Sequence, residues 1–430
     1  MNLSLAAYSL LAWAAQPLLK RKLRRRAKAE PGYAEAVPER FGCYTPRDLG
    51  REAAGQWVWV HAVSLGETRA AALLIHELRA AMPGMRLLLT HGTATGRAEG
   101  RKLLQPGDIQ VWQPWDSRKA VRRFLQQFQP AIGVLMETEI WPNLVQGCQR
   151  MGVPLVLANA RLNAKSQAGA QRWSSLFEPT YGALRAVWAQ TEEDAERLRS
   201  VGAPVQAVLG NLKFDVQPDA ALLEQGKAWR AVSQRPVVVL ASSREGEEAQ
   251  WMAQWAGRKF HGVAGQCQWL IVPRHPQRFD EVHVQLLEAG LRVARRSQWG
   301  DGLPPTDVDV WLGDSLGEMP LYYAAADIGL LGGSFEPLGG QNLIEAAACG
   351  CPMVIGPHTF NFAQVSQTAC EVGAAFRVLD MEQGVQLATA LVRDASSLAA
   401  ARQAALEFAA SHRGTARATA QAIQQLLPYR

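Results

Sequence analysis

Short apolar runs alternate with longer segments of helical periodicity from residue 57 onward. The runs are rich in β-branched and aromatic side chains, which predicts strands rather than helices. Strands that alternate with helices form parallel sheets, because each parallel connection needs a long crossover. In the first half of the chain, the expected strands cover residues 57–63, 85–90, 109–112, 131–136, 154–159, 186–190 and 205–209.

A second series of the same kind begins at residue 236. Residues 211–235 interrupt the rhythm with a polar stretch that contains Pro218, and we interpret them as the connection between two domains. A chain of 430 residues also exceeds what one hydrophobic core usually organises. The strands expected in the second domain cover residues 236–241, 269–272, 291–294, 308–312, 328–331 and 352–355.

The alternation predicts an α/β protein with two Rossmann-like lobes that face a central cleft. Ligands of open parallel sheets bind beyond the carboxyl ends of the strands, so two facing lobes would share one site. The first lobe is expected over residues 27–210 and the second over residues 236–430. The Ala-rich residues 396–427 predict closing helices, one of which could return to the first lobe.

Residues 1–26 form a separate segment, in which an apolar run is followed directly by a basic one. The apolar run covers residues 3–19, a length compatible with a short spanning helix or with an interfacial anchor. A cleaved signal peptide would carry its charges before the apolar run, and a buried N-terminal helix is the remaining alternative. Positive charge beside a membrane predicts a protein body on the cytoplasmic side, near anionic lipids. The basic residues are Lys20, Arg21, Lys22, Arg24, Arg25 and Arg26.

Composition and charge change this picture little. The chain is 48% apolar and 20% charged, as globular proteins are, and most of its net charge of +6 is local to the basic run. No nucleic-acid partner is therefore expected. The six cysteines form no C-x-x-C pair and have no histidines at zinc spacing, which indicates reduced thiols in a cytoplasmic body.

The first candidate for chemistry is Glu67, at the corner between the first strand and a helical pattern that starts at Thr68. Gly66 permits a turn that brings the backbone close to a ligand, and Ser64 lies in the same segment. A carboxylate at a helix N-terminus is stabilised in its charged form, which suits a general base facing a cleft. The alternative is that Glu67 only complements the helix dipole.

Two further loops follow strands of the first lobe. Glu137 and Glu139 come just after an apolar strand, where they could position sugar hydroxyls or cap the helix begun by Pro142. Arg97 ends a loop of small hydroxyl residues at 91–97, which could bind an anion or cap a helix.

The second lobe repeats the same arrangement. Ser242, Ser243 and Glu245 follow its first strand, where hydroxyls and backbone amides could meet a phosphate. Arg274 follows the next strand between two prolines, and its planar fork matches a phosphate unless it is only a surface side chain.

Glycines are concentrated between residues 313 and 345. Their spacing is neither a dinucleotide fingerprint nor a Walker loop. Glycines before a helix that starts near Asn342 would leave amides for a phosphate, and Glu345 could reach ribose hydroxyls. A sugar-nucleotide pocket explains both features, whereas a simple glycine turn leaves Glu345 unexplained. Because no metal-ligand cluster or Ser-His-acid triad emerges, we expect neither a metal nor a cofactor.

With these residues assembled, the chain resembles the bacterial 3-deoxy-D-manno-octulosonic acid (Kdo) transferases over nearly its whole length. The N-terminal apolar and basic runs belong to the resemblance. One small departure is Ser243-Arg244 before Glu245, where the family favours a threonine first. The matching motifs cover residues 39–42, 61–67, 137–143, 211–215, 274–276, 332–345 and 349–352.

The resemblance implies a GT-B fold and inverting transfer of Kdo from CMP-Kdo to a lipid A precursor, lipid IVA, at the cytoplasmic side of the inner membrane. It implies that Glu67 is the base for the acceptor hydroxyl. From their positions after strands of the first lobe, we assign Ser64, Gly66, Arg97 and Glu137 to the acceptor or sugar side. Glu139 and Lys213 match cleft residues linked to catalysis or sugar binding. The positions that match the CMP site are Arg274, Met319, Gly340, Asn342 and Glu345.

Two other functions remain open from the sequence. One is a different sugar-nucleotide protein of the same fold, such as a UDP-sugar transferase or an epimerase. The other is a membrane-tethered nucleotide-binding scaffold without catalysis.

Overall fold

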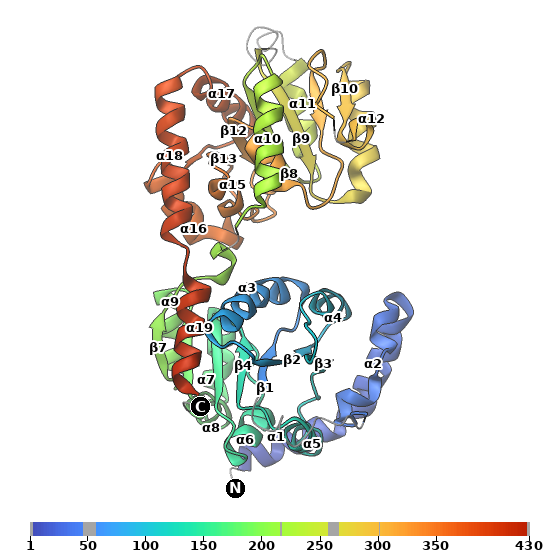
Figure 1. Cartoon of the computed structure of the whole chain (residues 1–430), viewed down its shortest axis with the longest axis vertical. Helices are drawn as coiled ribbons and strands as arrows, with labels where there is room; N and C mark the ends of the chain where they lie inside the picture. The colour runs from blue at the N-terminus through green and yellow to red at the C-terminus, as the bar shows by residue number, and fades with distance from the viewer. Residues whose placement is uncertain (1–2, 46–56, 216, 257–265, 301, 428–430) are drawn as a thin grey trace. The chain divides into compact units, whose positions relative to one another are not determined.

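The computed structural model describes residues 3–45, 57–215, 217–256, 266–300 and 302–427 (Figure 1). The chain forms two compact units. The first comprises Met1–Asp215 together with Gly414–Arg430, and the second comprises Val216–Arg413.

The first unit is built on a seven-stranded parallel sheet of order β3-β2-β1-β4-β5-β6-β7. Successive residues of β1 point to opposite faces, so that Trp57 and Trp59 join one core cluster while Val58 and Val60 join another. Both faces are therefore covered, as parallel sheets require. The strands are β1 (Trp57–His61), β2 (Arg86–His91), β3 (Ile109–Trp112), β4 (Ile132–Met136), β5 (Leu155–Ala160), β6 (Ala186–Ala189) and β7 (Val205–Val208). The helices are α3 (Leu65–Ala81), α4 (Ala94–Arg101), α5 (Arg118–Phe128), α6 (Pro142–Arg150), α7 (Ala164–Arg172), α8 (Ser174–Gly182), α9 (Glu192–Ser200) and α19 (Thr415–Leu426).

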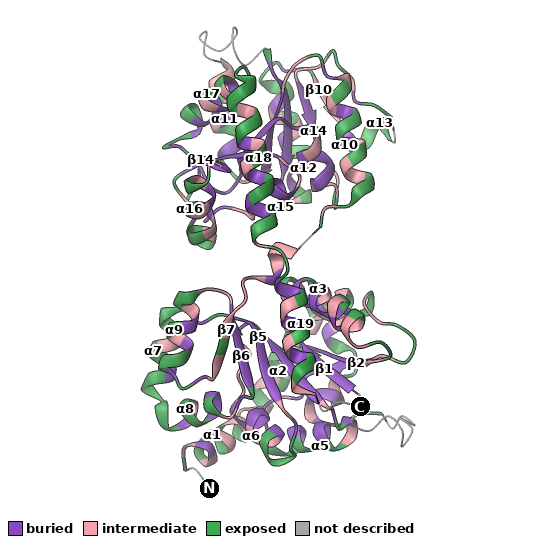
Figure 2. Cartoon of the chain, turned by 60° about the vertical axis from the view of Figure 1, so that its left-hand side comes forward, coloured by how far each residue is buried: buried purple, intermediate pink, exposed green. Residues whose placement is uncertain are grey.

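The second unit has another seven-stranded parallel sheet, of order β10-β11-β9-β8-β12-β13-β14. Figure 2 shows buried strands at the centre of each unit and helices with exposed outer faces. The strands are β8 (Val237–Ser243), β9 (Gln268–Pro273), β10 (Val293–Arg295), β11 (Val310–Leu312), β12 (Ile328–Leu331), β13 (Met353–Ile355) and β14 (Ala375–Arg377). The helices are α10 (Ala220–Val232), α11 (Glu247–Ala256), α12 (Phe279–Glu288), α13 (Arg296–Trp299), α14 (Met319–Ala325), α15 (Ile344–Ala348), α16 (Ala363–Glu371), α17 (Met381–Leu391) and α18 (Ala395–Ser411).

All the strands expected from the sequence are present, and the short edge strand β14 is an addition. The domain limits differ in two places. Residues 211–235 are not simply a connection, because α10 lies within them and packs so closely on α14 that a Cβ at Gly226 would lie 2.3 Å from the Leu321 carbonyl oxygen. Residues 414–430 return to the first unit instead of closing the second, as α19 packs on α3.

The N-terminal apolar run is two helices and not one anchor helix. It breaks between α1 (Leu3–Ala14) and α2 (Gln16–Ala29), where Pro17 lies in the first turn of α2. Proline is accepted at the start of a helix but disrupts a helix interior, so the break follows from the sequence. No helix among residues 3–427 that the structure describes is long and apolar enough to span a membrane.

Candidate active site

The candidate residues follow the strands at which the strand order of each sheet reverses. In the first unit, β2 and β3 lie on one side of β1 and β4 lies on the other. In the second unit, β9 and β12 flank β8 in the same way. Loops that leave such a switch point diverge, and the crevice between them is where open parallel sheets bind ligands. Glu67 follows β1 and Glu137 follows β4. In the second unit, Ser242 lies near the end of β8, and the glycines at 332–340 follow β12.

Glu67 is the third residue of α3 and takes part in a capping box. The Ser64 hydroxyl oxygen accepts the Glu67 backbone N–H at 3.4 Å, while the Glu67 carboxylate accepts the Val63 N–H at 2.8 Å and the Ser64 hydroxyl at 3.0 Å. Because α3 begins at Leu65, Gly66 lies in the first helical turn and not in a turn before it. A Cβ at Gly66 would meet nothing within 4 Å, which leaves the backbone there open to a ligand.

The charges of Glu67, Glu137 and Glu139 influence one another, and we call these three residues the carboxylate cluster. Burial raises the pKa of Glu67 and of Glu139, and the charge of Glu137 raises both further. Glu137 is buried and pairs with Arg161 at 2.8 Å and with the Lys213 Nζ at 3.4 Å. The Glu139 carboxylate accepts the indole N–H of Trp141 at 2.8 Å. The backbone of Glu137 has φ +56°, a left-handed conformation that costs a non-glycine residue energy and is concentrated at functional sites.

A hydrogen-bond network holds Lys213 beside this cluster. The Asn211 side chain accepts the Lys213 N–H at 3.0 Å and donates to Gln190 at 3.0 Å. Gln190 in turn donates to the Asn159 carbonyl at 2.8 Å, and the Asn159 side chain accepts the N–H of Leu212 at 3.0 Å. Sequence reasoning missed Asn159, Gln190 and Arg161, although each closes or follows a predicted strand, which is the signal that identified Glu67.

Arg97 belongs to a different cluster in the first unit. Its guanidinium lies 4.7 Å from the centre of the Trp112 ring and 3.8 Å from the Glu39 carboxylate. Arg40 stacks on the same indole at 3.8 Å, and burial lowers the pKa of its guanidinium to about 10. Glu39 accepts the backbone N–H of Trp112 at 2.8 Å. This cluster fastens residues 37–41 to the sheet, and Arg97 takes part in that packing. The assignment of Arg97 to the acceptor or sugar side stays a prediction.

In the second unit, Ser243 is not available to a phosphate. Its side chain is fully buried, and its hydroxyl donates to Glu248 at 2.7 Å, which also receives two guanidinium N–H groups of Arg278. Ser242 is half-buried, with φ +56°. Glu245 is exposed and pairs with Arg244 at 3.0 Å, and hydrogen bonds with Arg244 and its own backbone keep the pKa of its carboxyl low.

Glu247 joins the two loops at this switch point. Its fully buried carboxylate accepts the N–H of Arg244 at 2.8 Å, of Gly333 at 2.8 Å and of Phe335 at 3.0 Å. One side chain thereby fixes the loop after β8 to the loop after β12. The sequence did not single out this residue, because the two loops lie far apart along the chain.

The glycine-rich segment differs in detail from the expectation. Helix α15 starts at Ile344 and spans five residues. The Asn342 side chain accepts the Ile344 N–H at 3.1 Å. The Gly340 N–H donates to the Gly333 carbonyl at 2.7 Å, with φ +75°. The Gly340 amide is therefore already engaged, and the assignment of Gly340 and Asn342 to the donor site stays a prediction.

Arg274 and Glu345 nevertheless belong to one electrostatic neighbourhood. Burial, then the charge of Glu345, raises the pKa of the Tyr323 phenol, whereas the charge of Arg274 lowers it. The Arg274 side chain is exposed, and its backbone N–H donates to the Ser243 carbonyl at 3.0 Å. Met319 is half-buried at the start of α14, the helix that carries Tyr323.

Comparison with known proteins decides the family. A family model described as 3-deoxy-D-manno-octulosonic-acid transferase matches residues 35–216. The 3-deoxy-D-manno-octulosonic acid transferase of Bordetella pertussis is 44% identical over 427 residues, which are 98% of this chain and 99% of the relative. The chain belongs to the Kdo transferase family. It is a glycosyltransferase that transfers Kdo in lipopolysaccharide biosynthesis.

Two further comparisons agree with this family and its fold. The Kdo transferase of Haemophilus influenzae is 29% identical over 98% of this chain and 96% of the relative. A UDP-GlcNAc 2-epimerase from Neisseria meningitidis matches at a TM-score of 0.56 over 86% of this chain and all of that chain, with 14% identity. At that identity the epimerase supports the fold alone, which is the two-sheet GT-B architecture of this Kdo transferase.

Proposed function

We propose that this Kdo transferase takes Kdo from CMP-Kdo and attaches it, with inversion, to the lipid A precursor lipid IVA. The observation that carries the proposal is the carboxylate cluster at the first switch point, where Glu67 is partly buried and has a raised pKa. A carboxylate with a raised pKa is a stronger base than a solvated one and accepts a proton more readily from a hydroxyl.

The transfer step follows from these groups. The acceptor hydroxyl oxygen forms a bond to the anomeric carbon of Kdo, and its proton passes to Glu67. The bond from that carbon to the phosphate oxygen breaks, and CMP leaves with the electron pair. The N–H of Val63 and the hydroxyl of Ser64 hold the Glu67 carboxylate in place during the step. Attack from the face opposite CMP inverts the anomeric centre.

On the donor side, Arg274 is the residue best suited to the phosphate of CMP. Its guanidinium is exposed, always charged and able to bind two phosphate oxygens. The charges of Glu345 and Arg274 both influence the pKa of the Tyr323 phenol. Glu345 could accept hydrogen bonds from ribose hydroxyls. Since the Gly340 amide is engaged and α15 is short, Arg274 carries more of the phosphate recognition than the sequence suggested.

We further propose that α1 and α2 bind the cytoplasmic surface of the inner membrane. Leu10, Leu11 and Trp13 of α1 are 64%, 69% and 65% exposed, and Leu18 of α2 is 70% exposed. Along the chain, these side chains come directly before the basic run of α2. An exposed apolar face with adjacent lysines and arginines is typical of helices that lie in a membrane interface.

The test of the transfer proposal is to incubate the protein with CMP-Kdo and lipid IVA, weigh the lipid product and determine its anomeric configuration. The expected product is heavier by whole Kdo residues and has the inverted configuration. UDP-GlcNAc serves as the control donor and should give no product. A product of retained configuration would exclude direct attack assisted by a single base, and transfer from the UDP-sugar alone would exclude the donor assignment.

A further inference from the structure

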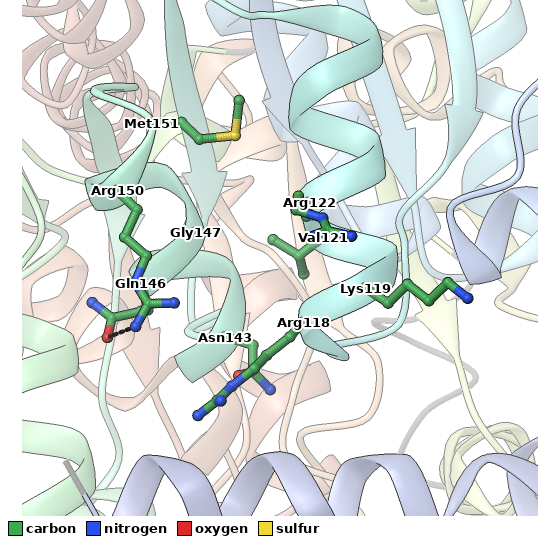
Figure 3. A pocket seen from close by; sticks show the side chains of 9 residues that line it. All are labelled: Arg118, Lys119, Val121, Arg122, Asn143, Gln146, Gly147, Arg150 and Met151. Carbon is green, nitrogen blue, oxygen red and sulfur yellow. Dashed lines mark hydrogen bonds between the residues drawn. The ribbon is translucent and has the colours of Figure 1, made fainter. Parts of the chain in front are cut away.

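A groove lies between α5 and α6 of the first unit, formed by residues other than those of the carboxylate cluster (Figure 3). It is a hollow of about 410 Å³, which is large enough for a phosphate group with its ester substituents. Its floor is the contact between Val121 and Gly147, where a Cβ on the glycine would lie 2.6 Å from the valine Cγ1. The absence of a side chain at Gly147 therefore allows the two helices to pack at the floor of the groove.

The walls of this α5–α6 groove are cationic. Arg118, Lys119 and Arg122 project from α5, and Arg150 projects from the last turn of α6. No acidic residue lines the groove among the described residues, and the sequences of α5 and α6 contain none. Like charges gathered around one hollow repel each other, so an anion in the groove would relieve that repulsion and accept charge-assisted hydrogen bonds.

Helix α1 is bonded to one end of the groove. The Arg118 Nε donates to the Ser9 hydroxyl oxygen at 3.0 Å, and Ser9 donates to the Asn143 side chain at 2.7 Å. The next two residues of α1 are the exposed Leu10 and Leu11. Apolar side chains suited to acyl chains therefore lie within about one helical turn of cations suited to a phosphate.

We propose that the α5–α6 groove binds the phosphate of an anionic phospholipid whose acyl chains contact α1. The inference rests on the proposed association of α1 with the membrane but not on the catalytic assignment. A headgroup in the groove would fix the orientation of the first unit on the membrane surface, which diffuse attraction to the basic run of α2 cannot do.

The test compares two adjacent arginines in the full chain. Arg122 lines the groove, whereas Arg123 lies outside it and contacts the Cys43 sulfur at 3.2 Å. Arg122→Gln and Arg123→Gln each remove one exposed positive charge from α5, so diffuse attraction to a membrane should fall equally. Binding is measured by sedimentation with vesicles of phosphatidylcholine alone and of phosphatidylcholine mixed with phosphatidylglycerol.

For vesicles with phosphatidylglycerol, Arg122→Gln should weaken binding roughly tenfold or more, the effect of losing a charge-assisted hydrogen bond. Arg123→Gln should weaken it by no more than about fivefold, the contribution of one cation near an anionic surface. Equal losses in the two variants would show that only diffuse charge acts and would overturn the groove site.

Two further arms identify the source of the phosphate and separate this inference from the membrane proposal. The first arm measures inorganic phosphate binding by calorimetry. If phosphate binds the wild type but not Arg122→Gln, and vesicle binding is the same for both proteins, the groove binds a soluble anion. The lipid assignment is then wrong. Equal binding of the wild type to both vesicle types, lost only in Leu10→Ser/Leu11→Ser, would keep the membrane proposal and overturn the groove site. Binding to neither vesicle type would contradict both proposals.

Discussion

Asp116 lies between β3 and α5, and its carboxylate caps α6 from within the protein. It accepts the backbone N–H of Asn143 at 3.0 Å and of Leu144 at 2.8 Å, and it shares a hydrogen bond with Tyr8 of α1. Burial dominates over these bonds and raises the pKa of Asp116 to about 6. Helix α1 is thus joined to the rest of the first unit through a carboxyl group that titrates in an accessible pH range.

This pKa makes a prediction about stability. Between pH 3.8 and about 6 the folded protein binds the Asp116 proton and the unfolded chain does not, so stability should fall as the pH rises through that window. The full effect is at most roughly 3 kcal/mol. Thermal unfolding of the wild type and of Asp116→Asn as a function of pH measures it, with Asp219→Asn as an exposed-carboxylate control. The fall in melting temperature with rising pH should be present in the wild type and the control and should be smaller in Asp116→Asn. Parallel curves for all three proteins would contradict the prediction.

Single residues also show which features of the site could be predicted from the sequence and which could not. Glu67, Glu137 and Lys213 could be predicted as candidates, because strand ends of parallel sheets converge and the motifs are recognisable. The sequence could not show that the Ser243 hydroxyl donates a hydrogen bond to Glu248 or that the Arg97 guanidinium stacks on the Trp112 ring. Those contacts depend on which side of a loop each side chain faces.

At the scale of elements, the strands were predictable because buried parallel strands are continuous apolar runs. The helix α10 was missed because residues 211–235 were interpreted by their polarity, although Asp219 accepts the N–H groups of Ala221 and Leu222 and so caps its start. The break between α1 and α2 could have been predicted from Pro17. Strand β14 was missed because only Ala375 of its three residues is fully buried, so no continuous apolar run marks it.

Loop positioning by Glu247 gives a prediction at this scale. Glu247→Gln removes the charge that holds backbone amides of both loops, so the loops after β8 and β12 should separate, and affinity for CMP should fall about tenfold. The control is Asp327→Asn, a buried carboxylate at the opposite end of the same sheet that accepts the Val237 N–H at 2.8 Å. Both variants should lower the melting temperature, but only Glu247→Gln should weaken CMP binding in calorimetry. Equal CMP affinities in the two variants would assign Glu247 to stability alone.

At the scale of the whole molecule, the chain leaves the first unit at Asp215 and returns at Gly414. Asp215 joins these two points, because its carboxylate accepts the N–H of Gly414 at 2.6 Å and also that of Ala416. The N-cap residue of α19 is Gly414, which has no side chain, and the Asp215 carboxylate takes over the capping although it is distant in sequence. The sequence indicated that a closing helix could return, but it could not identify this contact.

Removing that cap should loosen α19 from the first unit. Asp215→Ala should cost about 0.5–2 kcal/mol of stability, as other N-cap deletions do. Limited proteolysis followed by mass spectrometry should show faster cleavage within residues 414–427, whereas Asp394→Ala, which removes the N-cap of α18 in the second unit, should leave that segment protected. Identical cleavage of α19 in both variants would mean that Asp215 does not hold it.

The central claim is that Glu67 acts as the base of Kdo transfer and not only as a helix cap. The most direct test is the single-turnover rate of transfer from CMP-Kdo to lipid IVA for Glu67→Gln and Ser64→Ala. Ser64→Ala removes the cap hydroxyl and one of the two hydrogen bonds that orient the carboxylate, but it keeps the base itself. It should therefore cost about 0.5–2 kcal/mol of stability and slow transfer far less than Glu67→Gln does. Glu67→Gln should slow transfer by roughly a hundred- to ten-thousandfold, with CMP affinity unchanged. If Glu67→Gln instead transfers Kdo within a fewfold of the wild type, Glu67 is a helix cap and the base is Glu137 or Glu139.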